Sequence, residues 1–479
     1  MLEQQKNDLR ADKSMSQTGS TQKPGTSIGI LTLVAICIGY FMIILDTTVV
    51  NVALPDMQKH LGANVMGFQW ILDGYSLVFA SFMLTAGALG DRLGSKRIFL
   101  GGLALFTAAS IMCGLAPTLI TLVIARIIQG LGAALLVPSS LSLLSHSFPA
   151  PADRARAIAI WGGIAGIAAA AGPVLGGFLV NVLTWRSIFL INLPIGVLGF
   201  LLTLRFVSPA PHFPQRGLDL IAQLTAIVAL ATLTFTLIEG DALGWSAPPI
   251  VTALVIFVLA TAAFILREWR TRNPMLPLTL FSSPTFSAGS VIGLLLNFGF
   301  YGQLFFMPLF FQQLRGLSSF VTGLALLPES AMVLIASYLA GRFVASVGAQ
   351  VVMVIGLFVG CAGFLAMTEI NAATDYLFIF IMLVAVGFGT AFTMPAMTAA
   401  VIESAPRERS GITSAVLNAS RQIGSVLGVA LLGSLISAHR PILPGMHTAL
   451  LLAGVAFLLA ALLALLFVRK HRAVSNDGA

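Results

Sequence analysis

The chain has 479 residues, of which 57% are hydrophobic and only 9% are charged. Its mean hydropathy of +0.96 goes with an apolar content well above the roughly 45–50% of soluble domains. This composition excludes an ordinary soluble enzyme or binding domain and predicts a membrane protein.

Apolar stretches of about 20 residues, long enough to cross ~30 Å of hydrocarbon as a helix, recur from end to end. Because no water satisfies the backbone inside a bilayer, each stretch must be helical. We therefore predict an all-α membrane protein with fourteen spans, at 28–51, 66–89, 98–116, 119–145, 157–180, 187–206, 218–238, 249–266, 286–311, 321–343, 350–369, 375–400, 411–437 and 446–468.

Basic residues are distributed unevenly between the two sides of this topology. With the N-terminus inside, 20 of the 26 Lys and Arg fall on the cytoplasmic side, as the positive-inside rule requires. The net charge of +8 is thus explained by topology, with some attraction to anionic membrane lipid, and no nucleic-acid partner is expected. We predict a multi-pass protein of the cell inner (cytoplasmic) membrane with both termini in the cytoplasm.

The ends of the chain and its cysteines carry no chemistry in this interpretation. Residues 1–27 are polar, without a cleavable signal pattern, and are predicted to form a disordered cytoplasmic tail; 469–479 form a second tail. Cys37, Cys113 and Cys361 lie in apolar runs and are interpreted as small core residues rather than disulfide or metal ligands. No metal or cofactor is expected.

The sequence repeats itself at one offset. Gly87 and Gly94 have counterparts in Gly341 and Gly348, GLGAALLVP (130–138) matches GFGTAFTMP (387–395), and GPVLGG (172–177) matches GSVLGV (424–429). These matches predict a duplicated six-helix unit.

Six and six spans leave two over, at 218–238 and 249–266, flanked by Pro-rich and basic segments that mark connections. The domains expected are therefore a six-helix bundle at 28–206, a linker with two extra helices at 207–285 and a second six-helix bundle at 286–468. Two such halves can rock about a site between them.

Residues 87–97, GALGDRLGSKR, concentrate four charges between two apolar runs. Gly90 and Gly94 allow a tight turn, and the basic residues hold the loop in the cytoplasm. Asp91 is acidic, so neither the turn nor the positive-inside rule explains its presence in this loop. The second-half copy has Ala345 and Ser346 where Asp91 and Arg92 stand, so only one half carries the charges.

Two charges lie inside spans, where each costs ~2.5–3.5 kcal/mol on insertion scales. Asp46 is five residues from the outer end of the first predicted span, and Arg126 is seven residues from the same side in the fourth. At ~1.5 Å per residue their depths differ by only ~3 Å, so they are predicted to pair. The pair could couple protons or be a static ion pair that orients helices.

Proton coupling needs a titratable group inside the membrane. All six histidines lie in loops, in tails or at span ends, so the candidates are Asp46, Asp73 in the second span and Glu329 in the tenth. For Asp73 and Glu329 the alternative is a polar residue near a helix end that faces water. Arg421, in the thirteenth span, is interpreted equally as structural or functional.

Four motifs together resemble the major facilitator superfamily, specifically its fourteen-span drug:proton antiporter branch, over about 28–468. GALGDRLGSKR is similar to the loop signature between spans two and three, GIAAAAGPVLGG (166–177) to the antiporter motif, and LDTTVVNVALP (45–55) and LVIARIIQGLGAA (122–134) to the first- and fourth-span signatures. The resemblance implies the major facilitator fold, with two extra helices inserted between its bundles.

The resemblance also implies roles for residues. It assigns proton coupling to Asp46 and Arg126, and proton or cationic-drug contact to Asp73 and Glu329. It makes the loop a conformational latch on the cytoplasmic side, formed by Gly87, Asp91, Arg92, Gly94 and Lys96. It makes export rather than uptake the role that accompanies the antiporter motif, whose key positions are Gly172, Pro173, Gly176 and Gly177.

We therefore predict a monomeric exporter, not an enzyme, that removes lipophilic, cationic small-molecule drugs by alternating access in exchange for protons. An exporter of one endogenous metabolite or amino acid is the first alternative, and a proton-coupled importer is the second. A membrane enzyme or receptor is disfavoured because the loops contain no nucleophile–base pair, metal-ligand cluster or nucleotide-binding loop.

Overall fold

The computed structural model describes residues 26–209, 219–271, 274, 276–405, 410–438 and 442–468. The predicted tails lie outside these residues, apart from Thr26 and its neighbours, which begin the first helix. The described elements, all helical, include fourteen helices long and apolar enough to cross a membrane, as predicted. The helices are α2 (Thr26–Leu61), α3 (Val65–Leu93), α4 (Ser95–Gly114), α5 (Leu119–Ser147), α6 (Pro151–Val182), α7 (Ser187–Leu190), α8 (Asn192–Phe206), α9 (Leu220–Leu243), α10 (Pro248–Arg270), η1 (Leu278–Ser282), α11 (Pro284–Leu309), η2 (Phe310–Leu314), α12 (Ser319–Val347), α13 (Ala349–Ala366), η3 (Met367–Glu369), α14 (Tyr376–Glu403), α15 (Ser410–Ser437) and α16 (Ile442–Phe467).

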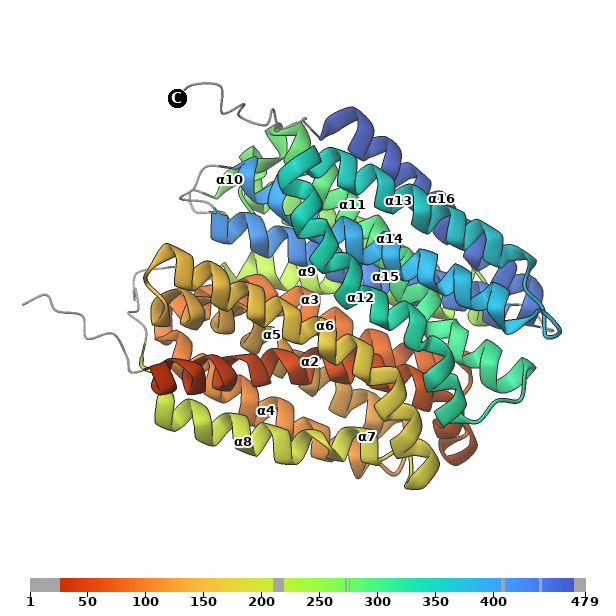
Figure 1. Ribbon diagram of the computed structural model, residues 1–479. Helices are drawn as coiled ribbons and strands as arrows, with labels where there is room; N and C mark the ends of the chain where they lie inside the picture. Colours follow the sequence, from red (N-terminus) through yellow and green to blue (C-terminus); the bar gives the residue numbers. More distant parts are fainter. Residues whose placement is uncertain are drawn as a thin grey trace, which may run out of the picture.

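The helices form two bundles, α2 to α8 and α11 to α16, that lie against each other (Figure 1). The bundles meet mainly through three helix pairs, α3 with α15, α6 with α12, and α2 with α11, and through a smaller contact of α2 with α12. The end of the molecule where α2 begins and α16 ends is called the terminal end below, and the opposite end is called the far end.

Equivalent glycines of the predicted repeat occupy equivalent turns. Gly94, between α3 and α4, has φ +96°, and Gly348, between α12 and α13, has φ +86°. Both turns need the left-handed region, which only glycine adopts at little cost.

A close contact between two helices in the first bundle also has an equivalent in the second bundle. Gly130 packs against the backbone of Tyr75, and Gly387 packs against the backbone of Glu329. Tyr75 and Glu329 therefore occupy corresponding places in the two halves.

The inserted helices pack on the outside of the junction between the bundles. Helix α9 contacts both α3 and α15, whereas α10 packs mainly against α9. Side-chain hydrogen bonds join α9 to α3: the Trp70 indole donates to Glu239 Oε1 (2.9 Å), and the Gln223 amide donates to the Ser81 carbonyl (2.9 Å).

The two ends of the bundle interface differ. At the far end, a Cβ added to Gly177 would collide with the backbone of Ser319 and Phe320, and Gly323 meets the backbone of Pro173 in the same way. Nearer the terminal end, a Cβ added to Gly162 of α6 or to Gly341 of α12 would have no heavy atom of another segment within 4 Å. Helices α6 and α12 thus touch at the far end and diverge toward the terminal end (Figure 1).

Some helix limits differ from the predicted spans. Helix α2 continues ten residues beyond 51, to Leu61, because Leu54 and Met57 remain fully buried against neighbouring helices. Helix α6 begins at Pro151, six residues before the predicted start of the fifth span at 157. Proline suits a first helical turn, where no amide donor is needed. The sixth span is broken into α7 and α8.

Candidate functional site

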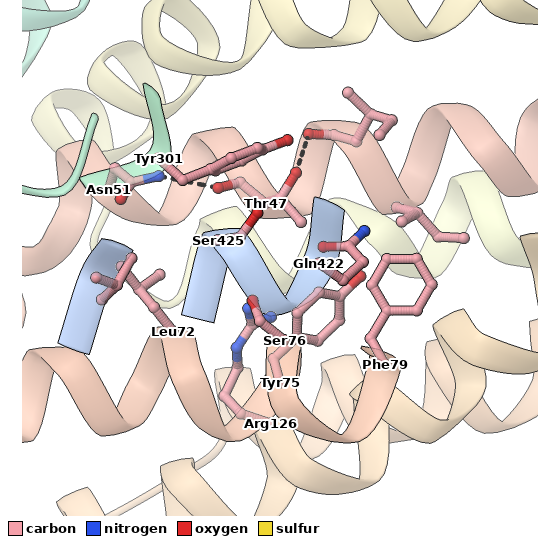
Figure 2. Close-up of a pocket in the computed structure, with 13 residues that line it drawn as sticks. Thr47, Asn51, Leu72, Tyr75, Ser76, Phe79, Arg126, Tyr301, Gln422 and Ser425 are labelled. Carbon is pink, nitrogen blue, oxygen red and sulfur yellow. Dashed lines mark hydrogen bonds between the residues drawn. The ribbon is translucent and has the colours of Figure 1, made fainter. Parts of the chain in front are cut away.

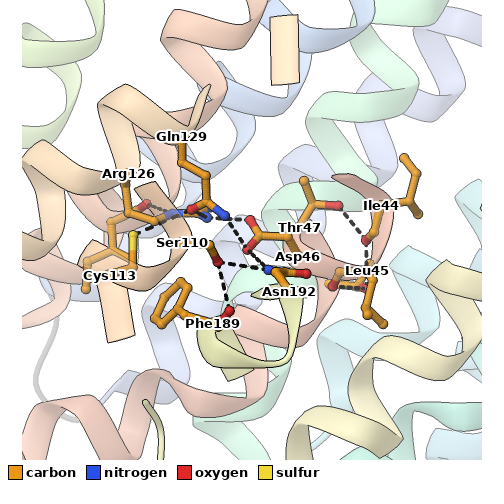
Figure 3. A network of polar contacts seen from close by, with 12 residues as sticks. Ile44, Leu45, Asp46, Thr47, Ser110, Cys113, Arg126, Gln129, Phe189 and Asn192 are labelled. Atoms are coloured by element: carbon orange, nitrogen blue, oxygen red, sulfur yellow. Dashed lines mark hydrogen bonds and ion pairs between the residues drawn. The ribbon is translucent and has the colours of Figure 1, made fainter. Parts of the chain in front are cut away.

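Asp46 and Arg126 form a buried ion pair, as their depths predict (Figure 3). Arg126 Nη1 donates to Asp46 Oδ2, and the two side chains are 1% and 0% exposed. Helix α5 is fixed at its far end by a capping box, in which Thr118 accepts from the Thr121 amide at 3.3 Å. Arg126 follows about two turns later and reaches α2.

Neutral side chains complete the network around the pair (Figure 3). Gln129 accepts from Arg126 Nη1 at 2.8 Å and donates to Asp46 Oδ1 at 2.9 Å. Asn192 donates to the same Asp46 oxygen at 3.3 Å and to Ser110 at 3.0 Å. Three donors therefore point at one carboxylate, which can accept all of them because each oxygen has two lone pairs.

Arg126 is also held from α3. Its Nε donates to the Ile71 carbonyl at 3.1 Å, and the Tyr75 ring centroid lies 4.2 Å from its guanidinium carbon. This distance is within the range of a cation–π contact.

A cavity lies between the bundles, beside the ion pair (Figure 2). The space between its lining atoms, including the part that is open to solvent, is about 510 Å³, and its walls come from helices of both halves. The lining residues are Ile43, Ile44, Thr47, Asn51, Leu72, Tyr75, Ser76, Phe79, Arg126, Tyr301, Gln422, Ser425 and Val429. Arg126 thus belongs both to the ion pair and to the cavity wall.

Asp73 and Glu329, the predicted substrate contacts, do not line this cavity. Asp73 is fully buried in α3, with neither carboxyl oxygen hydrogen-bonded within the described structure. Glu329 is 1% exposed; one of its oxygens accepts from Gln303 at 3.2 Å and the other has no hydrogen-bond partner among described residues. The alternative that they face water does not describe this conformation.

The loop motif between α3 and α4 lies at the terminal end. Gly94 ends one helix and begins the next, and the Ser95 and Ser142 hydroxyls are 2.7 Å apart. Lys96 Nζ donates to the Leu204 carbonyl at 3.1 Å, near the C-terminal end of α8, where a cation is favoured. This bond lies within one bundle and does not join the halves.

The small residues of the antiporter motif make close helix contacts. Gly172 and Gly176 face Thr48 and Val49 of α2, and Gly177 faces α12. Helix α6 therefore packs against its own bundle with one face and against the other bundle with the adjacent face.

Sequence reasoning missed several members of the site. Gln129 stands three residues after Arg126, on the same helical face, so its contact could have been anticipated. Asn192 and Tyr75 gave no signal, because one neutral polar residue in an apolar helix does not reveal its partner.

Comparisons with known proteins identify relatives along most of the chain. The family model described as Major Facilitator Superfamily matches residues 36–429 and 289–479. The methylenomycin A resistance protein of Bacillus subtilis (strain 168) is 40% identical over 458 residues, 95% of this chain and 98% of the relative. The multidrug resistance protein Stp of Mycobacterium tuberculosis (strain CDC 1551 / Oshkosh) is 40% identical over 409 residues, 85% of this chain and 76% of the relative.

Solved structures share the fold at low sequence identity. A D-xylose–proton symporter has a TM-score of 0.68 at 15% identity, over 94% of this chain and 99% of that one. An inward-facing, unoccupied bacterial homolog of the human lysosomal transporter Spinster has a TM-score of 0.63 at 18% identity, over 93% of this chain and 98% of that one.

Proposed function

Since the chain belongs to the major facilitator superfamily, we propose that it exports drugs across the cytoplasmic membrane in exchange for protons. Its relatives include proteins named for drug resistance and efflux. The observation that carries the proton-coupled part is the buried Asp46–Arg126 pair, whose arginine borders the cavity between the bundles.

Asp46 can gain and lose a proton while Arg126 keeps its position. When Asp46 takes up a proton it no longer balances the guanidinium charge, but Ile71, Gln129 and the Tyr75 ring still hold Arg126 in place. Protonation therefore changes the charge at the cavity wall while the wall keeps its shape. A substrate in the cavity would sense that change directly.

The conformation is inward-facing in this proposal. The positive-inside distribution assigns the terminal end to the cytoplasm, and that is the end where α6 and α12 diverge. Cross-bundle hydrogen bonds lie toward the far end, including Gln69 to the Val429 carbonyl (3.0 Å) and Gln312 to the Val52 carbonyl (2.9 Å). Export requires these contacts to open after substrate has entered from the cytoplasm.

The proton gradient supplies enough energy for this exchange. One proton contributes ~1.4 kcal/mol per pH unit and ~2.3 kcal/mol per 100 mV. The sum supports a gradient of about a hundredfold or more for a neutral drug exchanged with one proton.

The other motifs have supporting roles. Asp91 and its loop set the balance between open and closed states at the cytoplasmic end, and the glycines of α6 form the contact that opens at the outer end. Asp73 and Glu329 remain predicted carboxylates of the transport cycle, buried away from the cavity in this state. The chain functions as a monomer, without metal or cofactor.

Efflux from inverted membrane vesicles tests this function. We expect a fluorescent substrate to accumulate in vesicles only with an acidic interior, and to leave when the gradient is collapsed. Accumulation without a gradient, or movement in the direction of the proton, would contradict drug:proton antiport and favour import. Competition by structurally unrelated drugs separates multidrug export from export of one metabolite.

A further inference from the structure

The electrostatics of the cavity indicate which substrates it accepts. Among the lining residues, Arg126 alone carries a charge at neutral pH; the other polar groups are hydroxyls and amides. No carboxylate lines the described wall. The carboxylate nearest to that arginine, Asp46, already accepts from three side chains.

A second arginine stands next to the cavity, with no acidic partner among the residues that the structure describes. Arg421 of α15 immediately precedes the lining residue Gln422, and Ser425 donates to its carbonyl at 3.2 Å. Its Nη1 is 3.4 Å from Asn418 Oδ1, and its Nη2 is 3.1 Å from the sulfur of Met394. Its Nε is buried and has no hydrogen-bond partner within the described residues.

These contacts leave the Arg421 charge uncompensated. A guanidinium has five N–H donors, and a thioether sulfur with a distant amide oxygen satisfies few of them. The side chain is neither fully exposed nor fully buried, so water hydrates it only in part. An anion would supply both the charge and the acceptors that are missing.

A stacked aromatic pair lies in the other bundle. Tyr40 of α2 and Trp161 of α6 are stacked, with ring centroids 3.7 Å apart and planes 6° apart. Tyr40 precedes the lining residues Ile43 and Ile44 by about one turn, just as Arg421 precedes the lining residue Gln422, so both stand on the side of the cavity nearer the terminal end. The Trp161 indole Nε1 is a second buried donor without a hydrogen-bond partner in the described structure.

We propose that Arg421 and the Tyr40–Trp161 stack form the cytoplasmic entrance of the cavity and select flat, lipophilic anions such as aromatic carboxylates. This inference rests on the proposed export function and names its substrate class. The carboxylate would pair with Arg421 and the ring system would lie along the aromatic stack. A cation would instead meet the uncompensated charge of Arg421 in a site of low dielectric, where like charges repel more strongly than in water.

Two dyes with the same xanthene ring system test the proposal: fluorescein, an anion at pH 7, and rhodamine 123, a cation. Binding to the purified full chain is measured by fluorescence polarisation, without any gradient. We expect tighter binding of fluorescein. Arg421→Gln should weaken fluorescein binding by about tenfold to a hundredfold, the loss for one charge-assisted hydrogen bond, and should not weaken rhodamine binding.

Matched variants separate charge from folding. Arg421→Lys keeps the charge and should retain most fluorescein binding, and Arg270→Gln removes an exposed arginine of α10 and should change nothing. Trp161→Phe keeps the ring but loses the N–H, so it should weaken fluorescein a few-fold even if Arg421→Gln does not fold. Preference for rhodamine in the unaltered protein, or equal loss of both dyes in folded Arg421→Gln, would overturn the proposal.

The outcome is independent of transport. If both dyes are exported under a gradient and Arg421→Gln changes neither rate, drug export is supported and the anion preference is rejected. Arg421-dependent fluorescein binding in a protein that moves no dye under any gradient would support the anion site and reject export.

Discussion

The ring of Tyr75 lies 4.2 Å from the guanidinium carbon of Arg126, and both residues line the central cavity. Arg126 is also bonded to the Ile71 carbonyl and to Asp46, so it is held from two other helices. A cation held by several partners keeps its position when one partner changes. The two members of the ion pair should therefore respond differently to substitution.

Asp46→Asn should abolish gradient-driven efflux while the protein still inserts and binds substrate. The amide has nearly the same volume and can still accept from Arg126, but it cannot carry a proton. Vesicle uptake under an imposed pH gradient measures the loss, and substrate binding provides the control. Gradient-dependent uptake at the normal rate would mean that Asp46 is a static partner.

Arg126→Ala should be at least as damaging, because it leaves Asp46 buried without its cation; breaking such pairs costs about 3–5 kcal/mol. Arg126→Lys should restore folding but only part of the activity, since an ammonium cannot reproduce the planar fork that reaches Asp46, Gln129 and Ile71 together. Thermal unfolding and efflux should be measured on the same preparations. Equal efflux with Lys and Arg would show that charge alone matters.

Gly177→Ala should impair closure of the far end. The added methyl would collide with the backbone of Ser319 and Phe320, and overpacking of this kind costs about 1–3 kcal/mol. Gly162→Ala in the same helix is the matched control, because no other segment lies within 4 Å of its Cβ position. Distances from spin labels at the far end should lengthen only in Gly177→Ala; no difference between the variants would argue against this contact as the gate.

Much of this architecture follows from the sequence, because an apolar segment that crosses a bilayer must be helical to satisfy its backbone hydrogen bonds. Fourteen spans, the duplication and the meeting of Asp46 with Arg126 are all visible in apolar runs and their spacing. The similar depths of Asp46 and Arg126 predicted their pairing correctly although the predicted end of the first helix was wrong, since α2 continues to Leu61.

The remaining features depend on helix rotation and packing, which composition does not encode. Asp73 is buried away from the cavity, while Arg421, left undecided between structure and function, stands beside it. Trp70 meets Glu239 across 169 positions of chain, so the placement of α9 against α3 required the fold itself. Intramembrane charge indicated where chemistry lies, but did not indicate which charges face the cavity.

Asp91→Asn should slow turnover more than it weakens substrate binding, because the loop lies at the terminal end, far from the cavity wall. A change there acts on the balance between conformations. Binding affinity and the initial efflux rate should be compared in one preparation. A collapse of binding with normal turnover of bound substrate would exclude the latch.

Asp73→Leu should raise thermal stability and lower transport. Both carboxyl oxygens are buried without hydrogen-bond partners among the described residues. A buried polar group without a partner lowers stability by about 1–3 kcal/mol. A stabilising substitution that removes activity marks a residue kept for function. Asp73→Glu should retain most transport. Unchanged efflux in a stabilised Asp73→Leu protein would remove Asp73 from the transport cycle.

The contact between Gly177 and the start of α12 has a consequence for how often the far end can open. Hydrophobic contacts resist separation in proportion to apolar area, at about 25 cal/mol per Å², and backbone meeting backbone at glycine hides very little such area. The helical peptide groups that become wet on opening already have their hydrogen bonds. The seam can therefore be tight enough to exclude water and still part at low cost, so it can serve as a joint that opens in every cycle.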